Sequence, residues 1–146
     1  MNRLTQKLDK LRKENKKALV AYLVAGDPDM DSTLEIMHLF VESGVDIIEV
    51  GVPFTDPIAE GPIIQRAHDR AIRKKVSLED IFTLIEKFRS KDDETPLVLM
   101  GYLNSFIFYK NLIIENKNNS VDSILVVDIP GELKIKDYGI ENENIN

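Results

Sequence analysis

The apolar positions of this chain follow two kinds of spacing along most of its length. Four short, mainly apolar runs are separated by segments in which apolar residues recur every three or four positions. Short apolar runs predict strands that are buried on both faces, and the wider spacing predicts amphipathic helices. The expected strands cover residues 19–24, 45–50, 97–102 and 124–127. The expected helices cover residues 3–16, 32–43, 62–74, 77–88 and 106–116.

Several of the expected helices have recognisable ends. Ser32 and Ser77 each precede an acidic residue three positions later, a pattern in which the serine caps the helix. Pro62 suits a first helical position because its missing N–H needs no partner there. Gly44 is typical of a residue that ends the preceding helix. The amphipathic segment 3–16 is expected to close one end of the fold.

A first helix followed by about four β-α units predicts an α/β fold with a parallel sheet and right-handed crossovers. An open doubly wound sheet and a (β/α)₈ barrel share this order, and the order alone does not separate them. In the barrel, side chains at the carboxyl ends of the strands form the active site. Glu49, Tyr102 and Asp128 all lie at such ends. We therefore expect the chemistry of the protein at that edge of the sheet.

The stretch from Val45 to Pro62 is the most distinctive part of the sequence. Its apolar run ends at Gly51, and prolines at positions 53, 57 and 62 follow. Proline excludes helix and central strand between Pro53 and Gly61. The segment is therefore a stiff loop directly after a strand, and it carries carboxylates at positions 56 and 60.

Glu49 lies near the end of that strand among apolar residues. Burying a carboxylate is costly and raises its pKa, which makes Glu49 a candidate to donate and accept protons. Glu60, on the stiff loop, would complete an acid–base pair. The alternative is an edge strand from which Glu49 faces water.

Composition narrows the class of protein. The net charge of −6 argues against general nucleic-acid binding. There is no cysteine, and His38 and His68 are isolated in sequence, so no metal site is expected. No apolar run approaches the roughly 20 residues of a membrane helix, and the basic N-terminus lacks a signal core, so we expect a cytoplasmic protein. The 146 residues suit a single domain, with residues 131–146 as a polar, poorly ordered tail.

The stretch around Glu49 resembles the signature of the tryptophan synthase alpha chain family. Its matching residues are Glu49-Val50-Gly51-Val52-Pro53-Phe54-Thr55-Asp56-Pro57 and Ala59-Glu60-Gly61-Pro62. Further matches are Ala25-Gly26-Asp27-Pro28-Asp29, Gln65-Arg66-Ala67, Met100-Gly101-Tyr102-Leu103-Asn104 and Val121-Asp122-Ser123-Ile124-Leu125-Val126-Val127-Asp128-Ile129-Pro130. These ordered motifs cover most of the chain, which makes the resemblance very specific. It implies a (β/α)₈ TIM barrel of which about the first four β-α units are present.

The resemblance also implies a reaction, the retro-aldol cleavage of indole-3-glycerol phosphate to indole and glyceraldehyde 3-phosphate in tryptophan biosynthesis. It implies that Glu49 is the acid–base residue. Glu60 stands where the family commonly has an aspartate that holds the indole N–H, and it is one methylene longer. Tyr22 and Tyr102 match positions that line the indole pocket, and packing in the barrel core is the alternative for both.

A partner is implied as well. Asp56 and Pro57 match the loop that meets the tryptophan synthase beta chain in an α2β2 heterotetramer. The beta chain uses pyridoxal phosphate, and nothing in this chain resembles a lysine site for that cofactor. We therefore expect the cofactor in the partner and none in this chain.

The chain departs from the family in length. A barrel of this kind typically needs about 250 residues. The glycine-rich phosphate site and the mobile loop of the family's second half are not in this sequence. A fragment, a frameshift product and a genuine half-barrel remain open. Two other functions also remain open, a non-catalytic subunit that docks on the beta chain and a different phosphate-handling barrel lyase.

Overall fold

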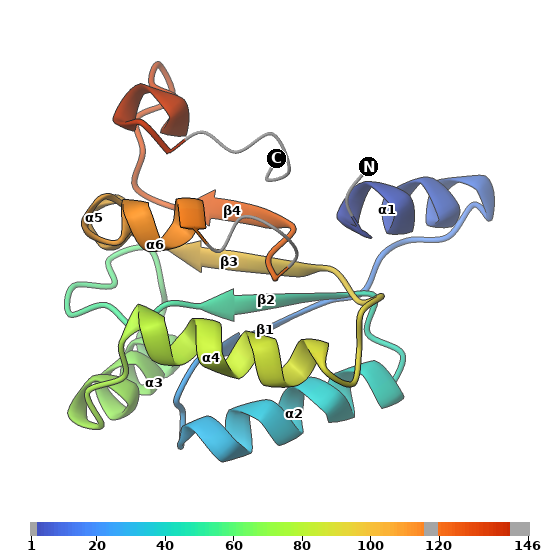
Figure 1. Ribbon diagram of the computed structural model, residues 1–146, viewed down its shortest axis with the longest axis horizontal. Helices are drawn as coiled ribbons and strands as arrows, with labels where there is room; N and C mark the ends of the chain where they lie inside the picture. Colours follow the sequence, from blue (N-terminus) through green and yellow to red (C-terminus); the bar gives the residue numbers. More distant parts are fainter. Residues whose placement is uncertain (1–2, 116–119, 141–146) are drawn as a thin grey trace.

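The computed structural model describes residues 3–115 and 120–140. Four strands form one parallel sheet in the order β1-β2-β3-β4 (Figure 1). These strands are β1 (Val20–Val24), β2 (Ile47–Gly51), β3 (Leu97–Gly101) and β4 (Ser123–Val126). The helices are α1 (Arg3–Lys13), α2 (Met30–Glu42), α3 (Pro62–Arg73), α4 (Leu78–Arg89), α5 (Leu103–Phe108), α6 (Lys110–Glu115) and the 3₁₀ helix η1 (Ile135–Tyr138). All four predicted strands are confirmed, with ends that shift by one or two residues.

The strand order decides between the two predicted architectures. Each strand pairs in parallel with the next strand along the chain, so the order never reverses. A doubly wound sheet contains a point at which the strand order does reverse, and ligands bind there. A steady progression of parallel strands with helical crossovers is the construction of a TIM barrel. The described chain is about half of one.

One face of the sheet is packed tightly against helices. The strand residues on this face are buried beneath α2 and α4, which lie together in front of the sheet in Figure 1. The α4 residues that the sequence predicted to point inward are Ile81, Phe82, Leu84, Ile85 and Phe88, and all are buried. Each such side chain stabilises the fold by about 1.5–3 kcal/mol relative to exposure.

The opposite face carries the candidate chemistry. Strand register places Tyr22 beside Glu49, and Glu49 beside Val98, with their side chains on this same face. Apolar residues farther out on it remain partly open, since Val20 is 48% and Leu125 is 44% exposed. In a closed barrel this face lines the interior, where the strands of the other half would cover it.

Helix α1 lies at the amino ends of the strands, away from the arrowheads in Figure 1. Arg3 bonds the buried Asp122 just before β4, and Lys7 lies 3.7 Å from Asp46 just before β2. These contacts confirm the prediction that the first helix closes one end of the fold. The apolar side of the helix is covered unevenly, because Leu11 is buried while Leu8 is 39% exposed.

Two predicted helix boundaries are wrong. Helix α2 begins one turn earlier than the serine pattern indicated, because Asp29 is the cap and its side chain accepts the Ser32 N–H at 2.8 Å. The single helix expected over 106–116 is two short helices, α5 and α6. The first of them begins at Leu103, whose N–H donates to the Asp128 carboxylate at 2.7 Å. The Asp128 carboxylate therefore stabilises the start of α5. By contrast, the Ser77 cap and the Pro62 start are confirmed.

The polar end of the chain is partly structured. Within the expected tail, residues 135–138 form η1, and Ile140 is buried against the main core. Residues 141–146 of that tail lie outside the described residues. No helix within 3–115 or 120–140 has the length and apolar content that crossing a membrane requires.

Candidate active site

Glu49 is the middle residue of β2 (Ile47–Gly51), between two neighbouring strands. Its backbone pairs with Tyr22 of β1 on one side and with Val98 of β3 on the other. This excludes the edge-strand alternative, because β2 has a strand on each side. The side chain is half-buried, and desolvation raises the pKa of its carboxyl group. Glu49 is thus a carboxylic acid whose proton is held more firmly than usual, on the inner face of the sheet.

Glu60 is brought to the same region by the loop between β2 and α3. Its side chain is only 7% exposed, although it belongs to a surface loop. The Tyr102 hydroxyl donates a hydrogen bond to Glu60 Oε2 and accepts one from the Ala59 N–H at 2.9 Å. Gln65 of α3 donates to the Glu60 backbone carbonyl at 2.9 Å. Both the side chain and the backbone of Glu60 are therefore fixed.

Tyr22 and His68 complete the cluster. The Tyr22 hydroxyl lies 3.4 Å from His68 Nε2, and that nitrogen lies 3.8 Å from Glu60 Oε1. On the other side of the ring, His68 Nδ1 accepts the Phe54 backbone N–H at 3.0 Å. His68 is almost fully buried on α3. The structure thus joins β1, α3 and the 52–61 loop through side chains far apart in sequence.

The two tyrosines keep their protons at neutral pH. Burial is the main cause that raises the pKa of Tyr22, and the nearby charges of Glu60 and Glu49 raise it further. For Tyr102, burial and the hydrogen bond to Glu60 raise the pKa to about 12. Both phenols are therefore hydrogen-bond donors. The Tyr102 ring also stacks on Phe54, with ring centroids 4.5 Å apart.

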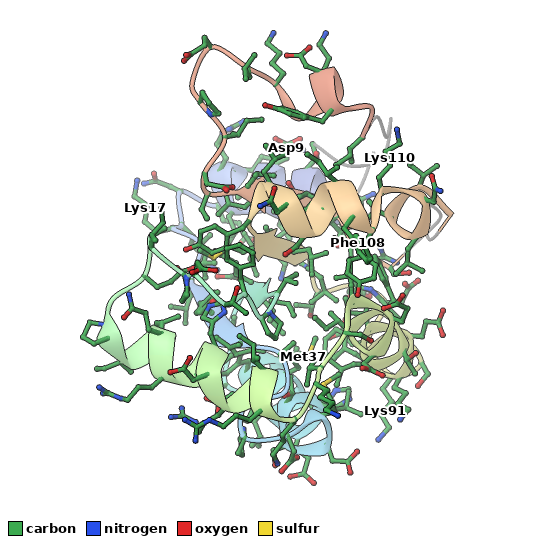
Figure 2. The ribbon with its side chains drawn as sticks, turned by 90° about the vertical axis from the view of Figure 1, so that its left-hand side faces the viewer. Asp9, Lys17, Met37, Lys91, Phe108 and Lys110 are labelled. Atoms are coloured by element: carbon green, nitrogen blue, oxygen red, sulfur yellow. The ribbon has the colours of Figure 1, made fainter. Side chains whose placement is uncertain are left out.

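Four of the six residues singled out from the sequence are brought together here, namely Glu49, Glu60, Tyr22 and Tyr102. Figure 2 turns the carboxyl ends of the strands toward the viewer. The other two, Asp56 and Pro57, lie farther along the same loop. Asp56 is exposed and its carboxylate accepts the Thr55 hydroxyl at 2.6 Å. The neighbouring Ile58 is 82% exposed. This part of the loop faces outward, away from the carboxylate pair.

His68 belongs to the site although its isolated position in the sequence did not predict this. A signal was present, because His68 lies beside Ala67 and three residues before Ala71 on the buried side of α3. A histidine on the apolar face of a helix that follows the Glu60 loop is well placed to reach that loop. Within the described ranges, His68 and the carboxylates do not form a group of three or more residues suited to a metal ion.

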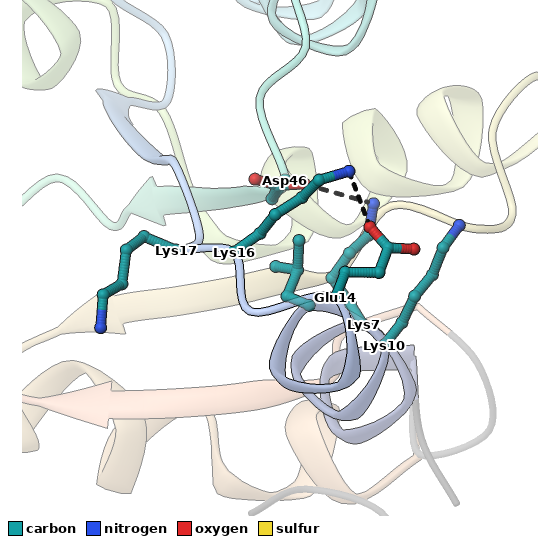
Figure 3. Close-up of a pocket in the computed structure, with 7 residues that line it drawn as sticks. Lys7, Lys10, Glu14, Lys16, Lys17 and Asp46 are labelled. Carbon is teal, nitrogen blue, oxygen red and sulfur yellow. Dashed lines mark hydrogen bonds and ion pairs between the residues drawn. The ribbon is translucent and has the colours of Figure 1, made fainter.

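A separate cavity lies at the amino end of the sheet. It has a volume of about 390 Å³ and is lined mainly by lysines of α1 and the following segment (Figure 3). Lys16 pairs with Glu14 at 2.8 Å, and Lys7 with Asp46. These pairs neutralise part of the positive charge of the cavity. The cavity lies beside α1 at the amino ends of the strands, and this position separates it from the loop that carries Glu60 at their carboxyl ends.

Comparison with known proteins decides the family. The family model described as "Tryptophan synthase alpha chain" matches residues 8–144. This chain belongs to the tryptophan synthase alpha chain family. The alpha chain of Thioalkalivibrio sulfidiphilus is 46% identical over 134 residues, which are 90% of this chain and 50% of that protein. The alpha chain of Nitrosomonas europaea is 43% identical over 134 residues, 90% of this chain and 49% of that protein.

Solved alpha-chain structures share the fold. The tryptophan synthase subunit alpha of Legionella pneumophila superposes with a TM-score of 0.88 at 41% identity, covering 96% of this chain and 53% of that one. The tryptophan synthase complex of Pyrococcus furiosus contains a chain that superposes with a TM-score of 0.70 at 43% identity, covering 77% of this chain and 47% of that one. The chain therefore spans about half the length of the alpha chains it matches, and it corresponds to the first half of their barrel.

Proposed function

We propose that this chain supplies the acid–base half of a lyase that cleaves indole-3-glycerol phosphate into indole and glyceraldehyde 3-phosphate, a step of tryptophan biosynthesis. Family membership supports the pathway. The observation that carries the reaction is the arrangement of Glu49, whose pKa burial raises, beside Tyr22 and near the fixed carboxylate of Glu60.

Cleavage requires one proton to enter and one to leave. Protonation of carbon three of the indole places positive charge on the ring nitrogen. Loss of the proton from the glycerol hydroxyl next to that carbon then forms the aldehyde, and the carbon–carbon electron pair returns to the ring. The same group can donate the first proton and accept the second, so the protons balance. A carboxyl group with a raised pKa suits both tasks, and we assign them to Glu49.

Glu60 is assigned to the positive charge that develops on the indole nitrogen. A carboxylate that is already fixed needs little reorganisation when this charge appears. The Tyr102 hydroxyl and the Gln65 amide hold Glu60 from two sides. Tyr22 and Tyr102 are proposed to line the indole site, with their rings beside the substrate.

The outward part of the loop is proposed to meet a tryptophan synthase beta chain in an α2β2 assembly. Asp56 is exposed, and Ile58 beside it leaves a large apolar side chain in solvent at 82% exposure. A single exposed apolar side chain is common on protein surfaces, so the docking proposal rests on the match of Asp56 and Pro57 to the family's loop, and Ile58 adds apolar area to it. Pyridoxal phosphate is expected in that partner. A docking subunit without catalysis is the second candidate, and the same exposed loop favours it.

The catalytic proposal is tested by measuring indole release from a complete protein and from its Glu49→Gln variant. Residues 1–146 are joined to the second half of the Legionella pneumophila alpha chain, and we refer to this protein as the complete barrel. The complete barrel is expected to release indole from indole-3-glycerol phosphate. Its Glu49→Gln variant is expected to fold but to lose this activity, because glutamine matches the shape of glutamate and cannot transfer protons. Indole release that persists in Glu49→Gln rejects the assignment. A complete barrel that binds the beta chain without releasing indole favours the docking candidate.

A further inference from the structure

Each of two tyrosine hydroxyls in this site has a nitrogen atom close to its oxygen. Tyr102 Oη accepts a hydrogen bond from the Ala59 N–H and donates one to Glu60 Oε2. Tyr22 Oη has His68 Nε2 at 3.4 Å in the corresponding place. A hydroxyl that accepts a hydrogen bond keeps its own proton for a second partner. The donor behind each tyrosine therefore determines where its proton points.

The loop backbone determines which nitrogen of His68 carries hydrogen. The Phe54 N–H donates to Nδ1 at 3.0 Å, so Nδ1 presents its lone pair and the neutral ring carries hydrogen on Nε2. Burial lowers the pKa of His68, against the opposing charges of Glu60 and Asp69. The neutral ring is therefore favoured, and its Nε2–H faces Tyr22 Oη. Glu60 Oε1 lies farther from that nitrogen, at 3.8 Å.

The position of Tyr22 makes its hydroxyl direction important. Tyr22 is the strand partner of Glu49, and the His68 nitrogen near its hydroxyl also lies 3.8 Å from Glu60 Oε1. The hydroxyl lies over Gly51 in space that a β-carbon would need, since a β-carbon there would stand 2.2 Å from the hydroxyl oxygen. When His68 donates to it, the Tyr22 hydroxyl keeps its own proton for another acceptor, and the carboxylates whose charges act on this tyrosine are Glu60 and Glu49.

We propose that His68 is a positioning residue of this site, whose Nε2–H orients the Tyr22 hydroxyl toward Glu49 and Glu60. This inference rests on the proposed function, in which Glu49 transfers the protons and Glu60 stabilises the charge on the indole nitrogen. A donor that is oriented before the substrate arrives requires no reorganisation during the reaction, which is the condition for strong electrostatic catalysis. Without His68, the Tyr22 hydroxyl is free to rotate.

Two substitutions in the complete barrel separate the two nitrogens of His68. In His68→Gln, the amide nitrogen stands near the Nε2 position and keeps a donor for Tyr22. In His68→Asn, the amide oxygen stands near the Nδ1 position and keeps an acceptor for the Phe54 N–H. We expect kcat of His68→Asn to fall about 10- to 100-fold, with a much smaller change in KM. We expect His68→Gln to retain most of the parent kcat.

The opposite order of the two variants would mean that His68 matters through Phe54 and the loop, and it would overturn the proposal. Equal losses in both variants would overturn it as well. A double-mutant cycle adds a second criterion. Because His68 acts through the Tyr22 hydroxyl, His68→Asn should cost little further activity in a Tyr22→Phe background. Fully additive losses would contradict this connection.

A spectroscopic measurement examines the geometry independently of turnover. In the complete barrel with ¹⁵N-labelled histidine at pH 7.5, the ring signals that disappear in His68→Gln belong to His68. We expect them to show hydrogen on Nε2, and hydrogen on Nδ1 would overturn the proposal.

The proposed function and the role of His68 fail in different ways. A complete barrel that releases no indole rejects the proposed function, and the ring signals then still decide the His68 geometry. An active barrel in which His68→Asn has full kcat rejects only the role of His68.

Discussion

Tyr22 and Gly51 lie on neighbouring strands so close together that only glycine fits beside the tyrosine. A β-carbon at position 51 would stand 2.2 Å from the Tyr22 hydroxyl oxygen and 2.7 Å from the ring carbon that bears it. Such contacts are far inside van der Waals distance, and the backbone atoms of β2 are fixed by pairing on both sides. Gly51 is therefore a condition for the position of Tyr22, a residue on which the charges of both Glu60 and Glu49 act.

The first prediction follows from this contact. Gly51→Ala in the complete barrel should displace Tyr22 and reduce indole release by at least about 10-fold, because a misplacement of about 1 Å is costly in an active site. Steady-state kinetics measure the loss. Gly131→Ala is the matched control, since a β-carbon there meets nothing within 4 Å. Normal kinetics in Gly51→Ala would show that the position of Tyr22 is unimportant.

The second prediction concerns the stability cost of Glu49. Desolvation raises its pKa, so the folded state holds the proton more firmly than the unfolded state does. Such a group destabilises the fold as pH rises through its folded pKa, and the cost is absent below the unfolded value of 4.5. Glu49→Gln should therefore raise the free energy of unfolding at pH 7.5, with a smaller gain near pH 4.5.

Urea unfolding at the two pH values tests this sign. Glu86→Gln is the control, because Glu86 is exposed on α4 and its replacement should produce no comparable gain. A Glu49→Gln variant that is less stable than the parent at pH 7.5 would show that the ionised carboxylate is compensated in the fold, contrary to the prediction. A gain in stability together with a loss of activity would mark Glu49 as a residue retained for chemistry.

The third prediction separates the charge of Glu60 from its length. Glu60→Ala should reduce kcat strongly, because it removes the carboxylate and leaves the Tyr102 hydroxyl without its acceptor. Glu60→Asp keeps the charge that the family commonly has at this place, and it should retain activity. Indole-release kinetics compare the two variants. If Glu60→Ala turns over like the parent, Glu60 is only a loop residue.

The fourth prediction concerns the opposite end of the sheet. Asp122 is 1% exposed and accepts hydrogen bonds from Arg89 Nη2 at 3.0 Å, from the Leu97 N–H at 2.9 Å and from Arg3. Removing one member of a buried ion pair leaves the other charge without compensation and costs about 3–5 kcal/mol. Asp122→Asn should lower the free energy of unfolding by that order.

Urea unfolding of the complete barrel measures this loss, with Arg12→Ala as the control. Arg12 pairs with Asp9 at 3.3 Å, but its side chain is 81% exposed, and an exposed pair contributes less than about 1 kcal/mol. The two variants should therefore differ clearly. Similar small effects would mean that the Asp122 cluster does not fix α1 and β4 to the rest of the sheet.

The sequence by itself determined the features that depend on local patterns. The four strands follow from their apolar runs, the inward face of α4 follows from the spacing of Ile81 to Phe88, and the start of α3 follows from Pro62. The sequence also predicted that Glu49 lies in a strand and that a stiff loop with Glu60 follows, but Glu49 is the middle residue of β2 and the strand continues to Gly51. These features depend on the structural preferences of residues that are close together in the sequence.

Only the tertiary structure decided which side chains meet. Tyr22 reaches His68 across 46 positions, Tyr102 reaches Glu60 across 42, and the Leu103 N–H finds Asp128 across 25. The last of these contacts accompanies a helix start that the local pattern placed too late. The tautomer of His68 and the direction of the Tyr22 hydroxyl likewise depend on a loop N–H and on a strand register. Such contacts arise when separate elements pack together, and no local preference of the sequence encodes them.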